Sequence, residues 1–118
     1  MAKKRNKLVI NKFYIAYGGN AHPALIFEKT KYGTYKAIKT GTTEGKEMIR
    51  INPTQKGMQN SFVNRRPFEG TRRDFGNREL IGISFDSRDM RIIEEIKKRK
   101  PKISKSAKLA HKKMPSSD

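Results

Sequence analysis

Short runs of apolar residues, several of them alternating with polar ones, fill the first half of the chain and predict strands. Residues 7–17, KLVINKFYIAY, are rich in Val, Ile, Phe and Tyr and predict a strand pair or one long bent strand. Residues 23–28, PALIFE, and 34–40, TYKAIKT, lie on either side of a turn at 31–33, and together they predict a hairpin. Residues 46–51, KEMIRI, alternate again and predict a further short strand.

The pattern lapses over residues 54–78, which hold three glycines and five arginines. A connection of this length without regular structure is uncommon unless it is functional or disordered. Strand character returns at 79–85, ELIGISF, and a helix is predicted over 86–100. Asp86 is the expected N-cap of this helix, and Pro101 is expected to end it.

About five short strands closed by one C-terminal helix predict a mainly β fold, in the form of a small, SH3-like antiparallel barrel. An OB-type barrel is the second alternative, and an open α+β sheet is the third. The expected organisation is a basic N-terminal arm at 1–7, the barrel domain at 8–96 with its closing helix at 86–100, and a basic C-terminal tail at 101–118. Both basic ends are expected to be disordered.

Lysine and arginine are concentrated at the two ends of the chain. Of 28 basic residues, 13 lie in 1–7 and 97–118, whereas residues 8–96 hold 15 basic and 10 acidic side chains, a net charge of +5 against +17 for the whole chain. Such an excess favours a polyanionic partner, because each phosphate contact releases condensed counterions. The alternative is that the basic ends of the chain only increase its solubility. The basic residues expected to bind nucleic acid here are Lys97, Lys98, Arg99 and Lys100.

The composition argues against disulfides, metal centres and membrane-spanning segments. The chain has no cysteine, so it forms no disulfide framework and no thiolate metal site, and its two histidines, His22 and His111, are too few for a histidine-rich metal centre. We therefore expect no metal and no cofactor. No apolar run reaches the roughly 18 residues needed to cross a bilayer, and no apolar stretch of signal-peptide length follows the charged N-terminus. These features favour a cytoplasmic protein without a membrane partner.

A basic-basic-x-Phe arrangement occurs twice in the arginine-rich stretch, as Arg65-Arg66-Pro67-Phe68 and Arg72-Arg73-Asp74-Phe75. Guanidinium groups fork onto phosphates, and phenylalanine rings accept stacked bases, so the two types together predict a platform for single-stranded RNA. Alternatively, the two phenylalanines hold the loop against the core while the arginines pair with nearby acids. Both descriptions can hold at once, with rings inward and arginines outward.

Two segments resemble the MazF/PemK-like ribonuclease toxins and the related RNA-antitoxin-controlled ToxN toxins. In that family a strand beginning in an R-P-A-L-V-like motif is followed by a hairpin and a strand ending in P-x-T. Residues 22–26, HPALI, are similar to the first motif, with His22 in place of the usual arginine, and residues 35–40, YKAIKT, are similar to the second, with Ile38 in place of proline. Residues 80–93, LIGISFDSRDMRII, resemble the family's late strand entering a helix.

The resemblance implies a metal-independent endoribonuclease in which the ribose 2′-hydroxyl attacks the adjacent phosphate. It also implies a partner antitoxin, either protein or RNA. The chemistry needs a proton acceptor, a proton donor and positive charge near the phosphorane. His22 is the acid/base candidate, Thr40 and Thr42 are donors to phosphate oxygens, and Lys39 and Arg65 supply charge. A half-buried histidine bonded to a loop carbonyl and threonines that cap strand ends are the structural alternatives.

Three functions therefore remain open. The first is an RNA-binding protein that acts as an endoribonuclease toxin, and the second is a non-catalytic nucleic-acid-binding module of a phage, mobile element or ribosome-associated system. The third is a basic protein that docks an acidic protein, because charge steering alone can drive such association.

Overall fold

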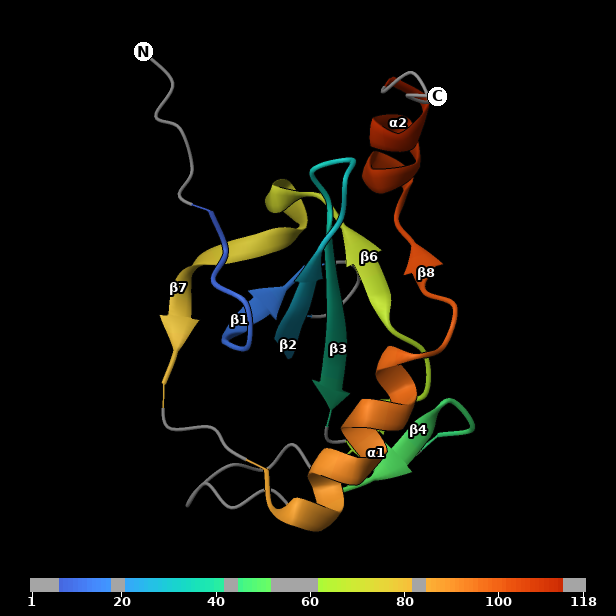
Figure 1. Cartoon of the computed structure of the whole chain (residues 1–118). Coiled ribbons are helices and arrows are strands. Elements are labelled where there is room, and N and C mark those ends of the chain that lie inside the picture. The colour runs from blue at the N-terminus through green and yellow to red at the C-terminus, as the bar shows by residue number, and fades with distance from the viewer. Residues whose placement is uncertain (1–6, 18–20, 42–44, 52–61, 82–84, 114–118) are drawn as a thin grey trace.

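The computed structural model describes residues 7–17, 21–41, 45–51, 62–81 and 85–113. These residues form a mainly β structure in which a sheet of eight strands, antiparallel except for one pair, is joined by two helices (Figure 1). The elements in chain order are β1 (Phe13–Ala16), β2 (His22–Lys29), β3 (Tyr35–Gly41), β4 (Met48–Arg50), β5 (Phe62–Asn64), β6 (Phe68–Gly70), the 3-10 turn η1 (Arg72–Asp74), β7 (Phe75–Leu80), α1 (Ser87–Lys97), β8 (Lys102–Ile103) and α2 (Lys105–Lys113).

The hairpin predicted around residues 31–33 is confirmed and forms the centre of the sheet. β2 and β3 pair antiparallel, with Leu25 opposite Ile38. Thr30 donates its backbone N–H to the Thr34 carbonyl at 2.9 Å, and Gly33 adopts φ +80° within the turn. Glycine suits this position because it takes positive φ without steric cost.

β3 pairs with two different strands along its length. Its first half, around Tyr35 to Ala37, pairs with β6, whereas Thr40 and Gly41 pair with β5. β5 and β6 therefore diverge from a common neighbour, and the short connection between them carries Arg65 and Arg66. The arginine-rich stretch at 54–78, for which the sequence predicts no regular structure, contains β5, β6 and the start of β7 among its described residues.

Alternate residues of β2 and β3 supply two separate cores, one on each face of the sheet. One core includes Ala24, Ile26 and Ala37 and is centred on the fully buried Phe75. The other core lies under α1 and includes two buried residues of that helix. Its buried residues are Phe13, Leu25, Ile38, Ile51, Val63, Ile93 and Ile96. Burying each large apolar side chain contributes about 1.5–3 kcal/mol, so both faces of the central hairpin are fixed.

The helix predicted after Asp86 is confirmed, although it ends at Lys97 rather than at residue 100. Asp86 is its N-cap, and the carboxylate accepts a hydrogen bond from the backbone N–H of Asp89 at 2.8 Å. Ile93 and Ile96 are fully buried, whereas Met90, about one turn before Ile93, remains 37% exposed. Pro101 follows the helix and disfavours its continuation.

The prediction of one helix and of a disordered tail from residue 101 is wrong through residue 113. β8 pairs in parallel with β6, and α2 follows it along the same side of the molecule (Figure 1). Ala107 of α2 is fully buried, and the Ser104 and Ser106 hydroxyls donate to Asp74. Lysine-rich composition concealed this segment because a surface helix needs only a few buried positions. Residues 1–6 of the predicted N-terminal arm lie outside the described part of the chain.

The sheet is open in the part of the chain that the structure describes. Its strand order runs β4-β5-β3-β2-β1-β7, and none of the described pairings joins β7 back to β4 or to β8. The mainly β, antiparallel prediction is confirmed, but a closed SH3-like barrel is not. Among the described residues, no helix has both the length and the apolar character needed to cross a membrane.

Candidate nucleic-acid interface

Positive charge gathers where α1 ends and the chain continues through β8 into α2. Residues 97–113 contain no Asp or Glu. The C-terminal end of a helix favours cations because its carbonyl dipoles point outward there. The basic residues of this segment are Lys97, Lys98, Arg99, Lys100, Lys102, Lys105, Lys108, Lys112 and Lys113.

Hydrogen bonds lock this segment to the β5–β6 connection. The Arg99 guanidinium donates through Nη1 to the Arg65 carbonyl at 3.0 Å. In return the Arg66 guanidinium donates through Nε to the Lys100 carbonyl at 3.4 Å and through Nη2 to the Pro101 carbonyl at 3.5 Å. These bonds join two stretches that lie 34 residues apart in the sequence, and four basic residues stand at their junction. We call the five basic residues of this junction and of β8 the basic ridge: Arg65, Arg66, Arg99, Lys100 and Lys102.

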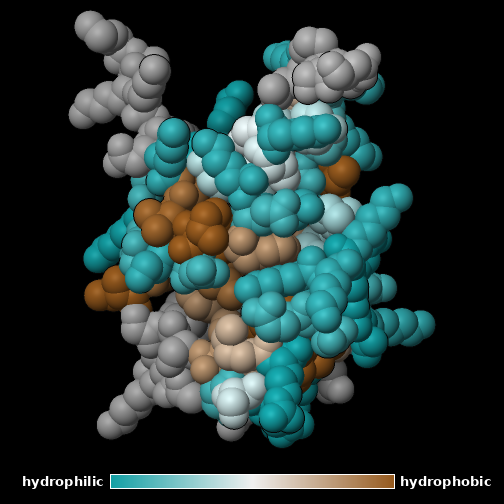
Figure 2. Space-filling view, viewed as in Figure 1, coloured by the Kyte–Doolittle hydropathy of each residue, from teal (hydrophilic) through white to brown (hydrophobic). Residues whose placement is uncertain are grey.

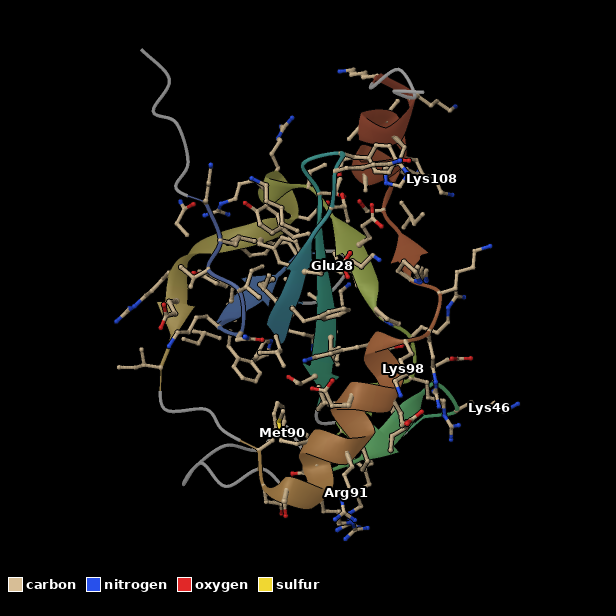
Figure 3. The ribbon with its side chains drawn as sticks, in the orientation of Figure 1. Glu28, Lys46, Met90, Arg91, Lys98 and Lys108 are labelled. Carbon is tan, nitrogen blue, oxygen red and sulfur yellow. The ribbon has the colours of Figure 1, made fainter. Side chains whose placement is uncertain are left out.

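The ridge lies on the hydrophilic side of the molecule. In Figure 2, hydrophilic residues dominate the side that carries β8 and α1, and hydrophobic residues gather toward the side of β1 and β7. Exposed apolar residues of that second side include Val9, Ile10, Tyr17 and Ile81. Lys98, the residue that follows α1, and Lys108 of α2 lie on the hydrophilic side, on the right in Figure 3. The two sides of the molecule in this view therefore differ in hydropathy.

Lys39 extends the ridge onto the face of the sheet. Its Nζ lies 4.0 Å from the centroid of the Phe68 ring, and Phe68 pairs with Lys102 across β6 and β8. Burial lowers the pKa of the Lys39 ammonium below its ordinary value, the charge of Lys102 lowers it further, and Asp74 acts in the opposite direction. Phe68 is partly buried and its ring is already covered by this ammonium, so a base could stack there only after Lys39 moves.

Asp74 fixes β8 against the sheet. One carboxylate oxygen, Oδ2, accepts hydrogen bonds from the backbone N–H of Thr71 at 2.8 Å, from Ser104 Oγ at 3.0 Å and from Ser106 Oγ at 2.8 Å. Ionised acceptors strengthen such bonds. The ridge is consequently held by a rigid support rather than by a flexible tail.

The second basic-basic-x-Phe element does not form a stacking platform. Phe75 is fully buried and packs edge-on against Phe68 with centroids 5.9 Å apart, so it offers no face to a base. Arg72 donates to the Phe75 and Gly76 carbonyls at 3.0 and 3.2 Å, which closes the turn after η1. Arg73 is exposed. The prediction of base stacking at Phe75 is wrong because the ring is needed in the core.

His22 and Thr40 do not share a face of the sheet. Extending the β2–β3 register places His22 opposite Gly41 and on the same face as Ala24 and Lys39. Thr40 points to the other face, is 1% exposed, and donates through Oγ1 to the Pro23 carbonyl at 2.9 Å. The two candidate catalytic side chains therefore do not converge, since neighbouring residues of a strand point in opposite directions.

The remaining candidates divide between paired and exposed groups. Lys97 and Lys98 pair with Glu94 and Glu95 at 3.0 and 3.5 Å. Arg65 is exposed at the side chain while its backbone N–H donates to the Glu47 carbonyl. Thr42, predicted as a donor to phosphate oxygens, lies outside the described residues. No group of three or more His, Cys, Asp or Glu side chains able to hold a metal ion occurs among the described residues.

Sequence reasoning missed the groups that dock α2. Glu69 is 3% exposed, and its Oε2 accepts from Thr34 Oγ1 at 2.7 Å and bonds His111 Nε2. The Tyr32 ring stacks on His111 with centroids 3.9 Å apart. An acidic residue in the middle of a predicted loop gave no signal of burial, and pairing with His111 depends on tertiary contacts 42 residues apart.

Comparison with protein-family models, with curated proteins and with solved structures finds no match to this chain.

Proposed function

We propose that the protein binds single-stranded RNA through the basic ridge, as a nucleic-acid-binding module. The observation that carries the proposal is the reciprocal hydrogen bonding of Arg65–Arg66 with Arg99–Lys100, which joins two distant segments that carry four basic residues. A sugar-phosphate chain bound along this junction would release condensed counterions at each phosphate contact.

Two features support RNA as a single strand rather than as a duplex. Arginine forks suit phosphates in any backbone geometry, and the ridge follows a turn and a two-residue strand rather than one long helix able to fill a major groove. The adjoining Phe68 ring lies under the Lys39 ammonium, and a movement of Lys39 would expose it for stacking with an unpaired base.

The test compares two double variants that remove the same charge from different places. Lys100→Gln with Lys102→Gln removes two cations from the ridge, and Lys12→Gln with Arg78→Gln removes two exposed cations from the region of β1 and β7, at the far end of the strand order. Fluorescence anisotropy with a labelled single-stranded RNA should show roughly a tenfold or larger loss for the ridge variant, because each lost phosphate contact weakens binding. The control variant should lose less than about twofold.

Equal losses in the two variants would contradict the proposal. Such a result would mean that overall charge attracts RNA without a defined surface. Tighter binding of a duplex of the same length would contradict the single-strand part alone.

A ribonuclease is the second candidate, favoured by one observation. His22 and Lys39 share a face of the sheet, and the lowered pKa of Lys39 brings its neutral amine within reach as a proton acceptor at high pH. The same candidate, taken with the MazF/PemK/ToxN resemblance, implies an SH3-like barrel, for which the sharing of β3 between β5 and β6 offers support. Thr40 no longer belongs in this scheme, because it is buried on the opposite face.

Incubation of the protein with mixed-sequence RNA in EDTA tests this candidate. A ribonuclease of the implied kind yields fragments ending in cyclic phosphate, and His22→Ala stops cleavage without weakening RNA affinity. Intact RNA under conditions where binding is complete would remove the ribonuclease and leave the binding proposal in place.

A further inference from the structure

A shallow depression lies between β4 and α1, directly beside the basic ridge. It has a volume of about 310 Å³ and is lined by Ile49, Arg91, Ile92, Glu95 and Arg99. Ile49 and Ile92 are partly buried and pack on the core beneath α1, so they form an apolar floor. Arg99 belongs to both the depression and the ridge, which makes the two surfaces continuous.

Three charged residues stand at the edge of this floor. Arg91 and Glu95 are four residues apart in α1, so they lie one turn apart on the same side of the helix. Arg99 follows two residues after the last residue of α1 and lines the same depression. Figure 3 shows Arg91 projecting from α1 near the lower end of the molecule. The lining thus combines an apolar floor with one carboxylate and two guanidinium groups.

We infer that this depression binds an unstacked guanine base of the single-stranded RNA, an inference that rests on the proposed RNA binding. The isoleucine side chains cover the face of the base, and Arg91 and Arg99 contact the phosphates on either side of it. Glu95 accepts hydrogen bonds from N1–H and N2–H of guanine. Adenine, cytosine and uracil lack two adjacent donors on that edge, so the carboxylate selects among bases.

Glu95 is free to make this contact at small cost. Its partner in the structure is Lys98 at 3.5 Å, and both side chains are about 70% exposed. Exposed pairs of this kind are weak. Arg99 is anchored by its bond to the Arg65 carbonyl, which holds the guanidinium at the rim.

The experiment measures affinity for four heptanucleotides, UUUNUUU with N as G, A, C or U, at one fixed salt concentration. Wild-type protein should bind the G-containing oligonucleotide roughly tenfold more tightly than the others, as expected for one bidentate contact. Glu95→Gln should reduce this preference to about twofold or less while leaving affinity for the all-U strand unchanged or slightly higher, because a negative charge is lost.

Glu94→Gln is the matched control. Glu94 is the preceding residue of α1, carries the same charge, and forms the same kind of pair with Lys97 at 3.0 Å, yet it does not line the depression. This variant should keep the preference for guanine.

A second readout observes the site directly. Guanosine monophosphate added to protein labelled at isoleucine methyl groups should shift the signals of Ile49 and Ile92 and leave those of the buried Ile26 and Ile38 in place. Equal affinity for all four oligonucleotides would overturn the guanine site and leave RNA binding intact, whereas no affinity for any of them would overturn both. Shifts produced by an oligoglutamate peptide but not by the nucleotide would assign the depression to an acidic protein partner instead.

Discussion

Glu69 is a buried carboxylate in a chain whose charges are mostly basic and exposed. It accepts a hydrogen bond from Thr34 and bonds His111, so a single side chain links the β2–β3 turn, β6 and α2. Burying a carboxylate is costly unless its oxygens are satisfied, and these two partners provide that compensation. The residue is therefore central to the attachment of α2.

Replacing Glu69 by glutamine should destabilise the protein by about 1–3 kcal/mol, because the neutral amide forms weaker bonds with both partners. Urea unfolding monitored by circular dichroism measures the change. Glu28→Gln is the control: Glu28 is half exposed and pairs with Lys36 at 3.3 Å, so its loss should cost less than about 0.5 kcal/mol. Equal costs would show that the buried network contributes nothing beyond an ordinary surface charge.

Lys39 makes a prediction about pH. Its pKa is lowered in the folded protein, first by burial and then by Lys102, whereas in the unfolded chain it returns to the ordinary 10.5. Between those two values the unfolded state binds more protons, so the free energy of unfolding rises with pH across that interval. Lys39→Met removes the titrating group, so its free energy of unfolding should lack this rise. At neutral pH the variant should be more stable than wild type, because it no longer buries a charged ammonium. This difference in stability should shrink as the pH approaches 10.5.

Urea unfolding of both proteins at several pH values up to about 10.5, the ordinary lysine pKa, checks this. Parallel stability curves for wild type and Lys39→Met would show that Lys39 titrates alike in the folded and unfolded states.

At the scale of the elements, α2 is the helix that the sequence did not predict, and its docking through Ala107 can be tested directly. Ala107 is fully buried and its neighbour Lys108 is exposed. A glutamate at position 107 places an unpaired charge on the buried side of α2, so Ala107→Glu should detach α2 and remove amide protection from residues 105–113 in hydrogen exchange. Lys108→Glu introduces the same side chain one residue later and should retain protection.

Protection that survives Ala107→Glu would contradict the docked position of α2. Loss of protection throughout the molecule, rather than in α2 alone, would show instead that the helix and the sheet unfold as one unit.

Local pattern was sufficient for some elements and insufficient for others. The β2–β3 hairpin and α1 could be predicted because alternation, a turn glycine and an N-cap aspartate are all local signals. β8 and α2 could not be predicted, because the contacts that hold them come from residues distant in the sequence. Asp74 bonds Ser106, Glu69 bonds His111, and Ala107 is buried against the rest of the molecule.

The candidate site also has features that the sequence predicts and features that only the fold reveals. The charge of Arg99 and Lys100 was visible in the sequence, but their contact with Arg65 and Arg66 required the fold. The expected cooperation of His22 and Thr40 failed for a simpler reason. Their relative orientation depends on the register between β2 and β3, and one residue of register decides which face each side chain occupies.

At the scale of the whole molecule, charge and hydrophobicity are unevenly distributed. Basic residues are frequent along α1, β8 and α2, and four of the six exposed large apolar residues in the described part of the chain lie in segments next to β1 and β7: Val9, Ile10, Tyr17 and Ile81 (Figures 1 and 2). The other two, Met90 and Leu109, lie on α1 and α2. A net charge of +17 on 118 residues would attract polyanions in any arrangement. What the fold adds is a supported line of basic residues, which under the proposed RNA binding would make a defined number of phosphate contacts.

The salt dependence of RNA affinity tests that claim most directly. With four or five ridge cations on phosphates of a single strand, a plot of log K against log salt should have a slope of roughly −3 to −3.5, so affinity should fall roughly 50- to 100-fold between about 50 and about 200 mM salt. Replacement of Lys100 and Lys102 by glutamine should make the slope shallower by about 1.4, and replacement of Lys12 and Arg78 should leave it unchanged. An affinity that hardly changes over this range, or a slope that responds equally to both pairs, would contradict binding of nucleic acid at the ridge.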